Sequence, residues 1–152
     1  MTDNIKMRFK KLNQKATAPK RATAWAAGYD LYAAMEDEYT DILPNETKLI
    51  GTGIAIELPN ENLAAFIYAR SGLAVKSGIA PANCVGVIDA DYRGELCVGL
   101  KNSSNQVFRV KNGDRIAQMV IAPVVIADLE ESDELSDTVR GVGGFGSTGI
   151  EK

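Results

Sequence analysis

The chain contains no histidine among its 152 residues. This absence excludes Ser-His-Asp and Cys-His nucleophilic catalysis, zinc bound through imidazole, and a histidine general base. Any proton abstraction near neutral pH must then fall to an aspartate, glutamate, lysine, tyrosine or cysteine side chain. If the protein is an enzyme, a carboxylate is the leading candidate for its base.

Cysteine is also scarce, since only Cys84 and Cys97 occur. Two cysteines at this spacing form neither a disulfide framework nor a metal-binding pair, so we expect both to pack as small hydrophobic groups. No apolar run approaches the length of a membrane span, and Met1-Thr-Asp-Asn-Ile5 lacks the apolar core of a signal peptide. The sequence therefore predicts a cytoplasmic protein with no membrane partner.

Neither sign of charge dominates, because 17 basic and 20 acidic side chains leave a formal net charge of −3. A chain with this balance lacks the positive field that attracts nucleic acid, so we expect no such partner. The charge is uneven, however, with basic residues gathered over 6–21 and acidic residues over 128–137. We interpret both as solvated stretches; the alternative is that one contacts the other, within or between subunits.

Apolar residues that alternate with polar ones dominate the pattern along the chain. Many short runs of this kind, separated by turn sequences, predict an all-β sandwich or barrel. One short helix is predicted over residues 71–77, with Ser71 as its capping residue and Gly78 directly after its end. The predicted strands include the runs at 7–9, 54–58, 63–68, 107–110, 116–121 and 124–126.

The pattern stops near residue 136, and five glycines follow within residues 140–149. Such a segment cannot bury enough apolar surface to offset a backbone entropy cost of about 1 kcal/mol per residue. We therefore divide the chain into a β domain over 1–135 and a flexible glycine-rich tail over 136–152. The tail is either a disordered end or a flap that orders on a ligand.

The most informative stretch is Gly86-Val-Ile-Asp-Ala-Asp-Tyr-Arg-Gly94. Alternating residues on both sides predict two strands, so we expect a hairpin tip here. Turn tips are usually glycine, asparagine, serine or proline, whereas this one carries two carboxylates, a phenol and a guanidinium. It is either a solvated turn with an internal Asp–Arg pair or a site carried on a rigid scaffold.

Four other segments have a similar character. Arg70 and Ser71 stand where a strand passes into the predicted helix, whose N-terminus suits phosphate, although a simple N-cap explains them equally well. Gln118 is an amide within an apolar strand and needs a partner, either structural or a ligand. Together with Asp89, these groups indicate a nucleotide with several phosphates and a water activated by a carboxylate. The remaining donors and aromatics of the set are Tyr92, Arg140, Phe145, Ser147 and Thr148.

In order and spacing, the five segments resemble the five motifs of the trimeric dUTP diphosphatases (dUTPases). They span residues 27–149, nearly the whole chain, and all five in register are highly specific although any one is weak. The segments are Ala27-Gly-Tyr-Asp-Leu31, Ala69-Arg-Ser-Gly-Leu73, residues 86–94, Gly113-Asp-Arg-Ile-Ala-Gln118 and Arg140-Gly-Val-Gly-Gly-Phe-Gly-Ser-Thr-Gly149.

The resemblance implies a jelly-roll-like β fold and a homotrimer whose active sites lie at subunit interfaces, each closed by a neighbour's tail. It implies hydrolysis of dUTP to dUMP and diphosphate, which keeps uracil out of DNA and supplies dUMP for thymidylate synthesis. It also implies Mg²⁺ as the cofactor, held by the substrate phosphates and water rather than by a protein cage.

Carried over by position, Asp89 would be the general base that activates the water attacking the α-phosphorus. Tyr92 would pack on the deoxyribose and exclude a 2′-hydroxyl. Asp30 and Asp114 would orient arginines from behind the site. The other residues implied to bind substrate are Arg70, Ser71, Gly72 and Gln118 at the phosphates, Asn83, Val87, Ile88 and Cys97 at uracil, and Arg140, Phe145, Gly146, Ser147 and Thr148 from the tail.

Two other functions stay open. A deaminase that acts on dCTP shares the fold and part of the pattern, and it would form dUTP rather than dUMP. A non-catalytic β-sandwich that binds a nucleotide as a signal, or a partner protein, is the second. The complete tail with Phe145 and the pair Asp89 and Tyr92 favour diphosphate hydrolysis.

Overall fold

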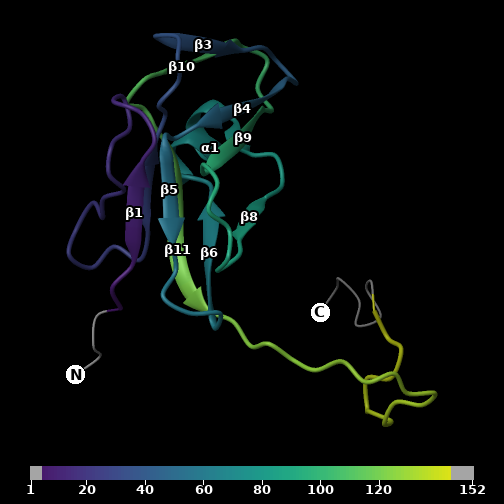
Figure 1. The fold of residues 1–152 in the computed structure, drawn as a ribbon. Coiled ribbons are helices and arrows are strands. Elements are labelled where there is room, and N and C mark those ends of the chain that lie inside the picture. The colour runs from purple at the N-terminus through teal and green to yellow at the C-terminus, as the bar shows by residue number, and fades with distance from the viewer. Residues whose placement is uncertain (1–4, 145–152) are drawn as a thin grey trace.

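The computed structural model describes residues 5–144, which form eleven β-strands and one short helix (Figure 1). The predicted all-β character is therefore confirmed. In chain order the elements are β1 (Arg8–Lys11), β2 (Tyr29–Tyr32), β3 (Tyr39–Ile42), β4 (Thr47–Gly51), β5 (Ile54–Glu57), β6 (Leu63–Tyr68), α1 (Ser71–Ser77), β7 (Ile79–Pro81), β8 (Val85–Ile88), β9 (Cys97–Asn102), β10 (Phe108–Lys111) and β11 (Arg115–Pro123).

The strands pair in antiparallel fashion into four sheets. The largest has the order β2-β11-β6-β8, and a second has the order β4-β9-β7. Two ribbons, β1-β5 and β3-β10, complete the body, and the β3-β10 ribbon lies at the top of Figure 1. Because neighbours in these sheets are often far apart in sequence, the sheets join distant motifs.

Alternation along the strands places one apolar face in a common core. In β9, for example, Val98 and Leu100 are buried whereas Cys97 is exposed. Burying side chains of this size contributes about 1.5–3 kcal/mol each, so the core accounts for much of the stability. The core side chains with almost no exposure include Leu31, Ile42, Ile50, Ile54, Ile79, Leu96, Leu100, Val110, Ile116 and Met119.

Asn102 is a polar residue that is fully buried at the end of β9. Its amide nitrogen donates to the carbonyls of Ile42 and Gln106 at 2.8 and 2.7 Å. Its amide oxygen accepts from the backbone N–H and hydroxyl of Ser104 at 2.9 and 2.8 Å. With these bonds satisfied, the side chain ties the loop after β9 to the end of β3.

The helix lies at the predicted residues, but its N-terminus differs from the prediction. Arg70, not Ser71, occupies the N-cap position. Its backbone is extended, and no side chain makes a capping hydrogen bond at this end of the helix. Ser71 is instead the first helical residue. At the other end Gly78 has the expected left-handed conformation, with φ of 66°, and its N–H bonds to Ala74.

Two further local predictions are wrong. Residues 124–126 form no strand: Val124 donates one hydrogen bond to Asn62, and β11 has already ended at Pro123. Both cysteines are exposed, Cys84 in a turn with φ of 62° and Cys97 on the outward side of β9. An apolar side chain is buried only where the sheet supplies a covering face, which the residue type does not determine.

Beyond Pro123 the described chain leaves the body as an extended segment (Figure 1), and residues 125–142 are exposed. Within residues 5–144, no helix is long and apolar enough to cross a membrane.

Candidate active site

The segment after β8 is not the hairpin tip that the sequence predicts. β8 pairs with β6 in the four-stranded sheet, whereas β9 pairs with β4 and β7 in the three-stranded sheet. Residues 89–96 therefore cross from one sheet to the other. We call this segment the crossover loop. Strand pairing is decided by partners elsewhere in the chain, so two successive strands with a short connection need not pair.

The crossover loop forms one wall of a cavity of about 290 Å³. Asp89 enters it from the end of β8, Cys97 from the start of β9, and Tyr92 from the loop itself. The Tyr92 hydroxyl donates to the carbonyl of Glu95 at 3.0 Å. The other lining residues are Leu49, Val87, Ile88 and Glu95.

The internal Asp–Arg pair of the solvated-turn interpretation does not form in this loop. The Arg93 guanidinium donates instead to the carbonyl oxygens of Ala90 and Tyr92, at 2.7 and 3.0 Å. These bonds stiffen the turn, and the exposed Asp89 side chain faces the cavity. A carboxylate at such a position can accept a proton from a water molecule.

A second cluster is centred on Asp30, which is only 8% exposed in the middle of β2. Its carboxylate accepts from the Arg70 guanidinium at 3.0 Å and from the Arg115 guanidinium at 3.2 Å. Arg70 also donates to the backbone carbonyl of Arg115 at 3.3 Å. One buried carboxylate thus holds two guanidinium groups, and guanidinium is a group that can bind phosphate oxygens.

Arg115 is a member of this cluster that the sequence reasoning missed. It lies in the quoted segment 113–118, but the only signal was its charge beside Asp114. Asp114 itself does not orient an arginine among the described contacts. Its carboxylate accepts the backbone N–H of Lys111 at 2.8 Å, which closes the turn between β10 and β11.

Gln118 lies next to the same cluster, opposite Asp30 in the β2-β11 register. Its side-chain nitrogen donates to the carbonyl of Ala69 at 2.9 Å, so the amide has a structural partner. A Cβ at Gly28 would lie 3.1 Å from the Gln118 side-chain oxygen, so glycine leaves room for the amide. Any contact of Gln118 with substrate stays a prediction.

The other predicted residues are dispersed. Ser71 and Gly72 are exposed in the first turn of α1, and Asn83 is exposed in the turn before β8. Arg140 lies far along the extended segment, where it donates to the Gly143 carbonyl. Phe145, Gly146, Ser147 and Thr148 lie outside the described residues.

Within one chain the Asp89 cavity and the Asp30 cluster lie at opposite ends of β6. Ile88, directly before Asp89, pairs with Ala65, whereas Arg70 follows the other end of the strand. Five residues of extended chain between Ala65 and Arg70 correspond to about 16 Å. A single chain therefore does not bring the Asp89 cavity and the Asp30 cluster together.

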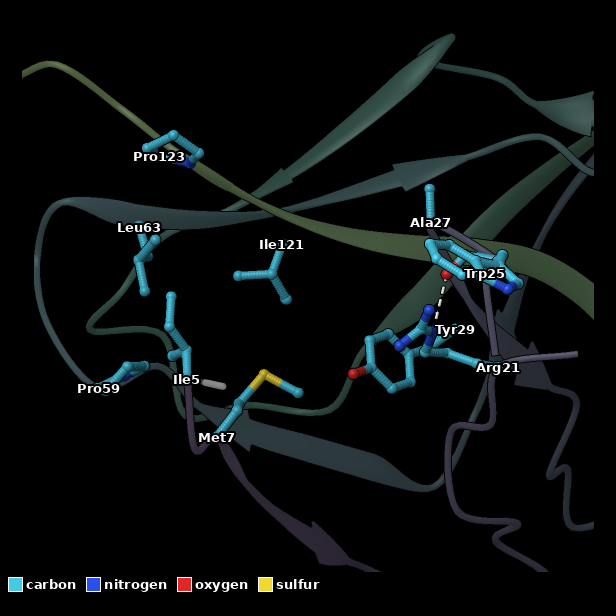
Figure 2. Close-up of a pocket in the computed structure, with 11 residues that line it drawn as sticks. Ile5, Met7, Arg21, Trp25, Ala27, Tyr29, Pro59, Leu63, Ile121 and Pro123 are labelled. Carbon is cyan, nitrogen blue, oxygen red and sulfur yellow. Dashed lines mark hydrogen bonds between the residues drawn. The ribbon is translucent and has the colours of Figure 1, made fainter. Parts of the chain in front are cut away.

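A cavity of about 460 Å³ lies apart from both groups (Figure 2). Ile5, Met7, Tyr29 and Ile121 point into a shared space there, and Arg21 bonds to the Ala26 carbonyl at 2.7 Å. None of its lining residues is a carboxylate or a predicted site residue. Its size alone does not make it the candidate for catalysis.

Comparisons with known proteins agree on one family. A family model described as dUTPase matches residues 14–149. The chain is 50% identical over 146 residues to the deoxyuridine 5′-triphosphate nucleotidohydrolase of Desulfitobacterium hafniense, covering 96% of each chain. It is 54% identical over 145 residues to the enzyme of the same name from Nautilia profundicola, covering 95% of this chain and 99% of the relative.

Solved structures show the same likeness. A mutant dUTPase of Staphylococcus bacteriophage 80alpha with dUpNHpp superposes with a TM-score of 0.85 at 29% identity, covering 95% of this chain and 99% of the other. A mutant dUTPase from phage phi11 of S. aureus, described with a structural Mg(II) ion, has a TM-score of 0.77 at 25% identity, covering 87% and 99%. These matches confirm the jelly-roll-like fold.

Proposed function

Because this chain belongs to the dUTPase family, we propose that its reaction, the hydrolysis of dUTP to dUMP and diphosphate, uses Asp89 as the general base. The main support for this role is the cavity at the crossover loop, which Asp89 and Tyr92 both line. The Asp89 carboxylate accepts the proton of a water molecule as that water attacks the α-phosphorus. With no histidine in the chain, a carboxylate is the natural group for this task.

Tyr92 selects the sugar in this proposal by packing flat on the deoxyribose and leaving no room for a 2′-hydroxyl. Its ring folds back over Gly94, where an added Cβ would lie 2.4 Å from the phenolic oxygen. The hydrogen bond to the Glu95 carbonyl holds the ring in this place. Uracil is read by Asn83, Cys97 and the end of β8 at Val87 and Ile88.

The phosphates are held by Arg70, Ser71, Gly72 and Gln118. The Asp30 carboxylate restricts the Arg70 guanidinium to one orientation, which lowers the entropy lost when it binds a phosphate oxygen. Charge neutralisation and positioning are the main needs of phosphoryl-group chemistry, since little other covalent work falls to the protein.

The separation of the two groups along β6 supports a homotrimer with shared sites. If one subunit supplies Asp89 and Tyr92 while another supplies Arg70 and its neighbours, a single chain need not join them. The β domain over 1–135 then builds these walls, and the segment 136–152 closes a neighbouring site with Arg140, Phe145, Gly146, Ser147 and Thr148. A cytoplasmic location stays part of this proposal.

Mg²⁺ fits this arrangement as a companion of the substrate. Within residues 5–144, no three Cys, Asp or Glu side chains are placed to hold a metal ion together. Triphosphate oxygens and water are the hard donors that Mg²⁺ prefers, and bound there it would neutralise phosphate charge. Arg70 and Gln118 would hold and orient the phosphates that carry the ion.

The test is diphosphate release by purified protein with Mg²⁺, comparing dUTP with UTP, dTTP and dCTP. We expect release from dUTP alone. Asp89→Asn should bind a non-hydrolysable dUTP analogue while turnover falls about 10²–10⁴-fold, the usual contribution of a general base. Asp91→Asn, two residues further in the same loop, is the matched control and should keep its rate.

Three outcomes would contradict the proposal. Full turnover by Asp89→Asn would show that the base is another group. Conversion of dCTP to dUTP would point to the deaminase instead. Tight binding of dUTP with no product from any substrate would point to a nucleotide-binding protein without catalysis.

A further inference from the structure

Glu95 stands at the end of the crossover loop and makes a contact that no part of the proposed reaction uses. Its carboxylate oxygen Oε1 accepts the backbone N–H of Gly53 at 2.7 Å, in a half-buried position. Gly53 lies in the turn between β4 and β5, with φ of 64°. The contact therefore ties the loop that carries Asp89 and Tyr92 to a turn 42 residues earlier in the chain.

The space around this carboxylate is shaped for it. A Cβ at Gly51 would lie 2.6 Å from Glu95 Oε1 and 3.3 Å from its carboxyl carbon. Gly51 is in β4, where backbone partners on β9 restrict any shift of the strand. Even an alanine there would push the carboxylate away from Gly53. Glycine at 51 and glutamate at 95 thus form a matched pair.

Glu95 also holds the Tyr92 side chain in place through its backbone carbonyl. The carbonyl of Glu95 accepts the Tyr92 hydroxyl at 3.0 Å, so the place of the phenol ring depends on the place of the Glu95 backbone. The next residue, Leu96, is bonded to Ile54 and Thr52, which anchors the loop from its other side. The Glu95 side chain adds a bond from the loop to Gly53 on the side of the tyrosine.

We propose that Glu95 is a positioning residue for sugar selection: through Gly53 it fixes the crossover loop so that the Tyr92 ring rejects a 2′-hydroxyl. The inference rests on the proposed packing of Tyr92 on the deoxyribose. Selection by exclusion is sensitive to position, because a displacement of about 1 Å can cost on the order of 100-fold in a positioned reaction.

Four variants test the chain of contacts by the ratio of kcat/KM for dUTP to that for UTP. Glu95→Ala removes the acceptor, Gly51→Ala displaces it sterically, and Tyr92→Phe keeps the ring but removes its hydrogen bond. Each should lower the ratio by about 10-fold or more. Glu95→Gln keeps an oxygen for the Gly53 N–H and should retain most of the ratio.

A matched control is Glu57→Ala, which removes a glutamate of β5 whose partner is the exposed Arg8. This variant should keep both the ratio and the rate. The melting temperatures of all variants are measured at one protein concentration. A general loss of stability lowers the melting temperature but does not lower the dUTP/UTP ratio selectively. A displaced loop lowers the ratio.

The Cys97 thiol gives a readout that does not depend on turnover. Partial desolvation in the cavity wall raises the pKa of this thiol, although the residue is exposed, and the neighbouring Glu95 carboxylate raises the same pKa further. In a Cys84→Ala background, Glu95→Gln should therefore lower the pH at which the thiol is alkylated. An unchanged alkylation profile would mean that the carboxylate does not lie where the inference requires.

The failure of this inference is distinguishable from that of the proposed function. If Tyr92→Ala loses sugar selection while Glu95→Ala, Gly51→Ala and Tyr92→Phe keep it, the role of Glu95 is wrong and that of Tyr92 stands. If Tyr92→Ala also keeps selection, the proposed role of Tyr92 is wrong. Should Glu95→Ala not fold, Tyr92→Phe with full selection would still overturn the inference.

Discussion

Asp30→Ala is the substitution whose effect follows most directly from the structure. The Asp30 carboxylate is buried and carries two charge-assisted hydrogen bonds, at 3.0 Å to Arg70 and 3.2 Å to Arg115. Such a bond contributes about 1.5–3 kcal/mol when it is shielded from water. The Arg70 side chain is 25% exposed, so its bond counts nearly in full.

The Arg115 bond contributes less because that side chain is 49% exposed and water replaces much of what is lost. We therefore assign about 2 kcal/mol to the Arg70 bond and about 0.5 kcal/mol to the Arg115 bond. An Arg70 guanidinium left without its carboxylate adds a further cost, which brings the total to about 3 kcal/mol, at the lower end for breaking a buried ion pair.

The same substitution should weaken dUTP binding. Arg70 keeps its 3.3 Å bond to the Arg115 carbonyl, so the guanidinium is loosened rather than released. We expect KM for dUTP to rise about 10-fold, equivalent to about 1.4 kcal/mol, with a smaller change in kcat. Urea unfolding at fixed protein concentration measures the stability, and steady-state diphosphate release measures the kinetics.

Asp41→Ala is the matched control, because Asp41 also pairs with an arginine across two strands. Its bidentate bonds to Arg109 are short, at 2.7 Å each, but the pair is exposed on the β3-β10 ribbon. The Asp41→Ala variant should lose far less stability than Asp30→Ala and should leave KM for dUTP unchanged. Equal losses in the two variants, or an unchanged KM in Asp30→Ala, would refute the reasoning.

Three further predictions follow from particular contacts. Asn102→Ala should lower the free energy of unfolding by about 3 kcal/mol, measured in urea, because the buried amide loses one buried and three part-buried hydrogen bonds; a loss below about 1 kcal/mol would mean that water replaces them. The hydrogen bond from Arg109 lowers the pKa of Asp41 below its ordinary value of 3.8. The ion pair therefore stabilises the fold above pH 3.8, and this stabilisation is lost as the pH falls through the lower pKa of the folded state. The difference in melting temperature between the protein and Asp41→Asn should accordingly shrink in acid, and a constant difference would contradict the assignment. Truncation after Thr138 should leave the oligomer unchanged in sedimentation while most turnover is lost, and an undiminished rate would show that the tail closes no site.

Much of the local structure was predictable because it depends on neighbouring residues. Strand-forming residues marked β6 at residues 63–68, and the helix at 71–77 ended at Gly78 as expected. Backbone preferences and side-chain periodicity act over a few residues, so a single sequence contains them. The five motifs that resemble dUTPases were visible in the same way, since their order and spacing are linear properties.

Predictions failed where a result depended on partners elsewhere. Residues 124–126 have the composition of a strand but no neighbouring strand continues the ladder beside them. Val85–Ile88 and Cys97–Asn102 are successive strands, yet each found its partners in a different sheet. The cysteine at 97 is exposed for the same reason, because the sheet covers only the opposite side of its strand.

The sequence by itself determined which chemical groups are present: a carboxylate at 89, a phenol at 92, an arginine at 70 and no histidine at all. Only the tertiary structure decided which of them meet. Asp30 reaches an arginine 40 residues later and another 85 residues later, and Glu95 reaches a backbone N–H 42 residues earlier. Such contacts arise from sheet pairing that closes long loops, and local periodicity contains no record of those pairings.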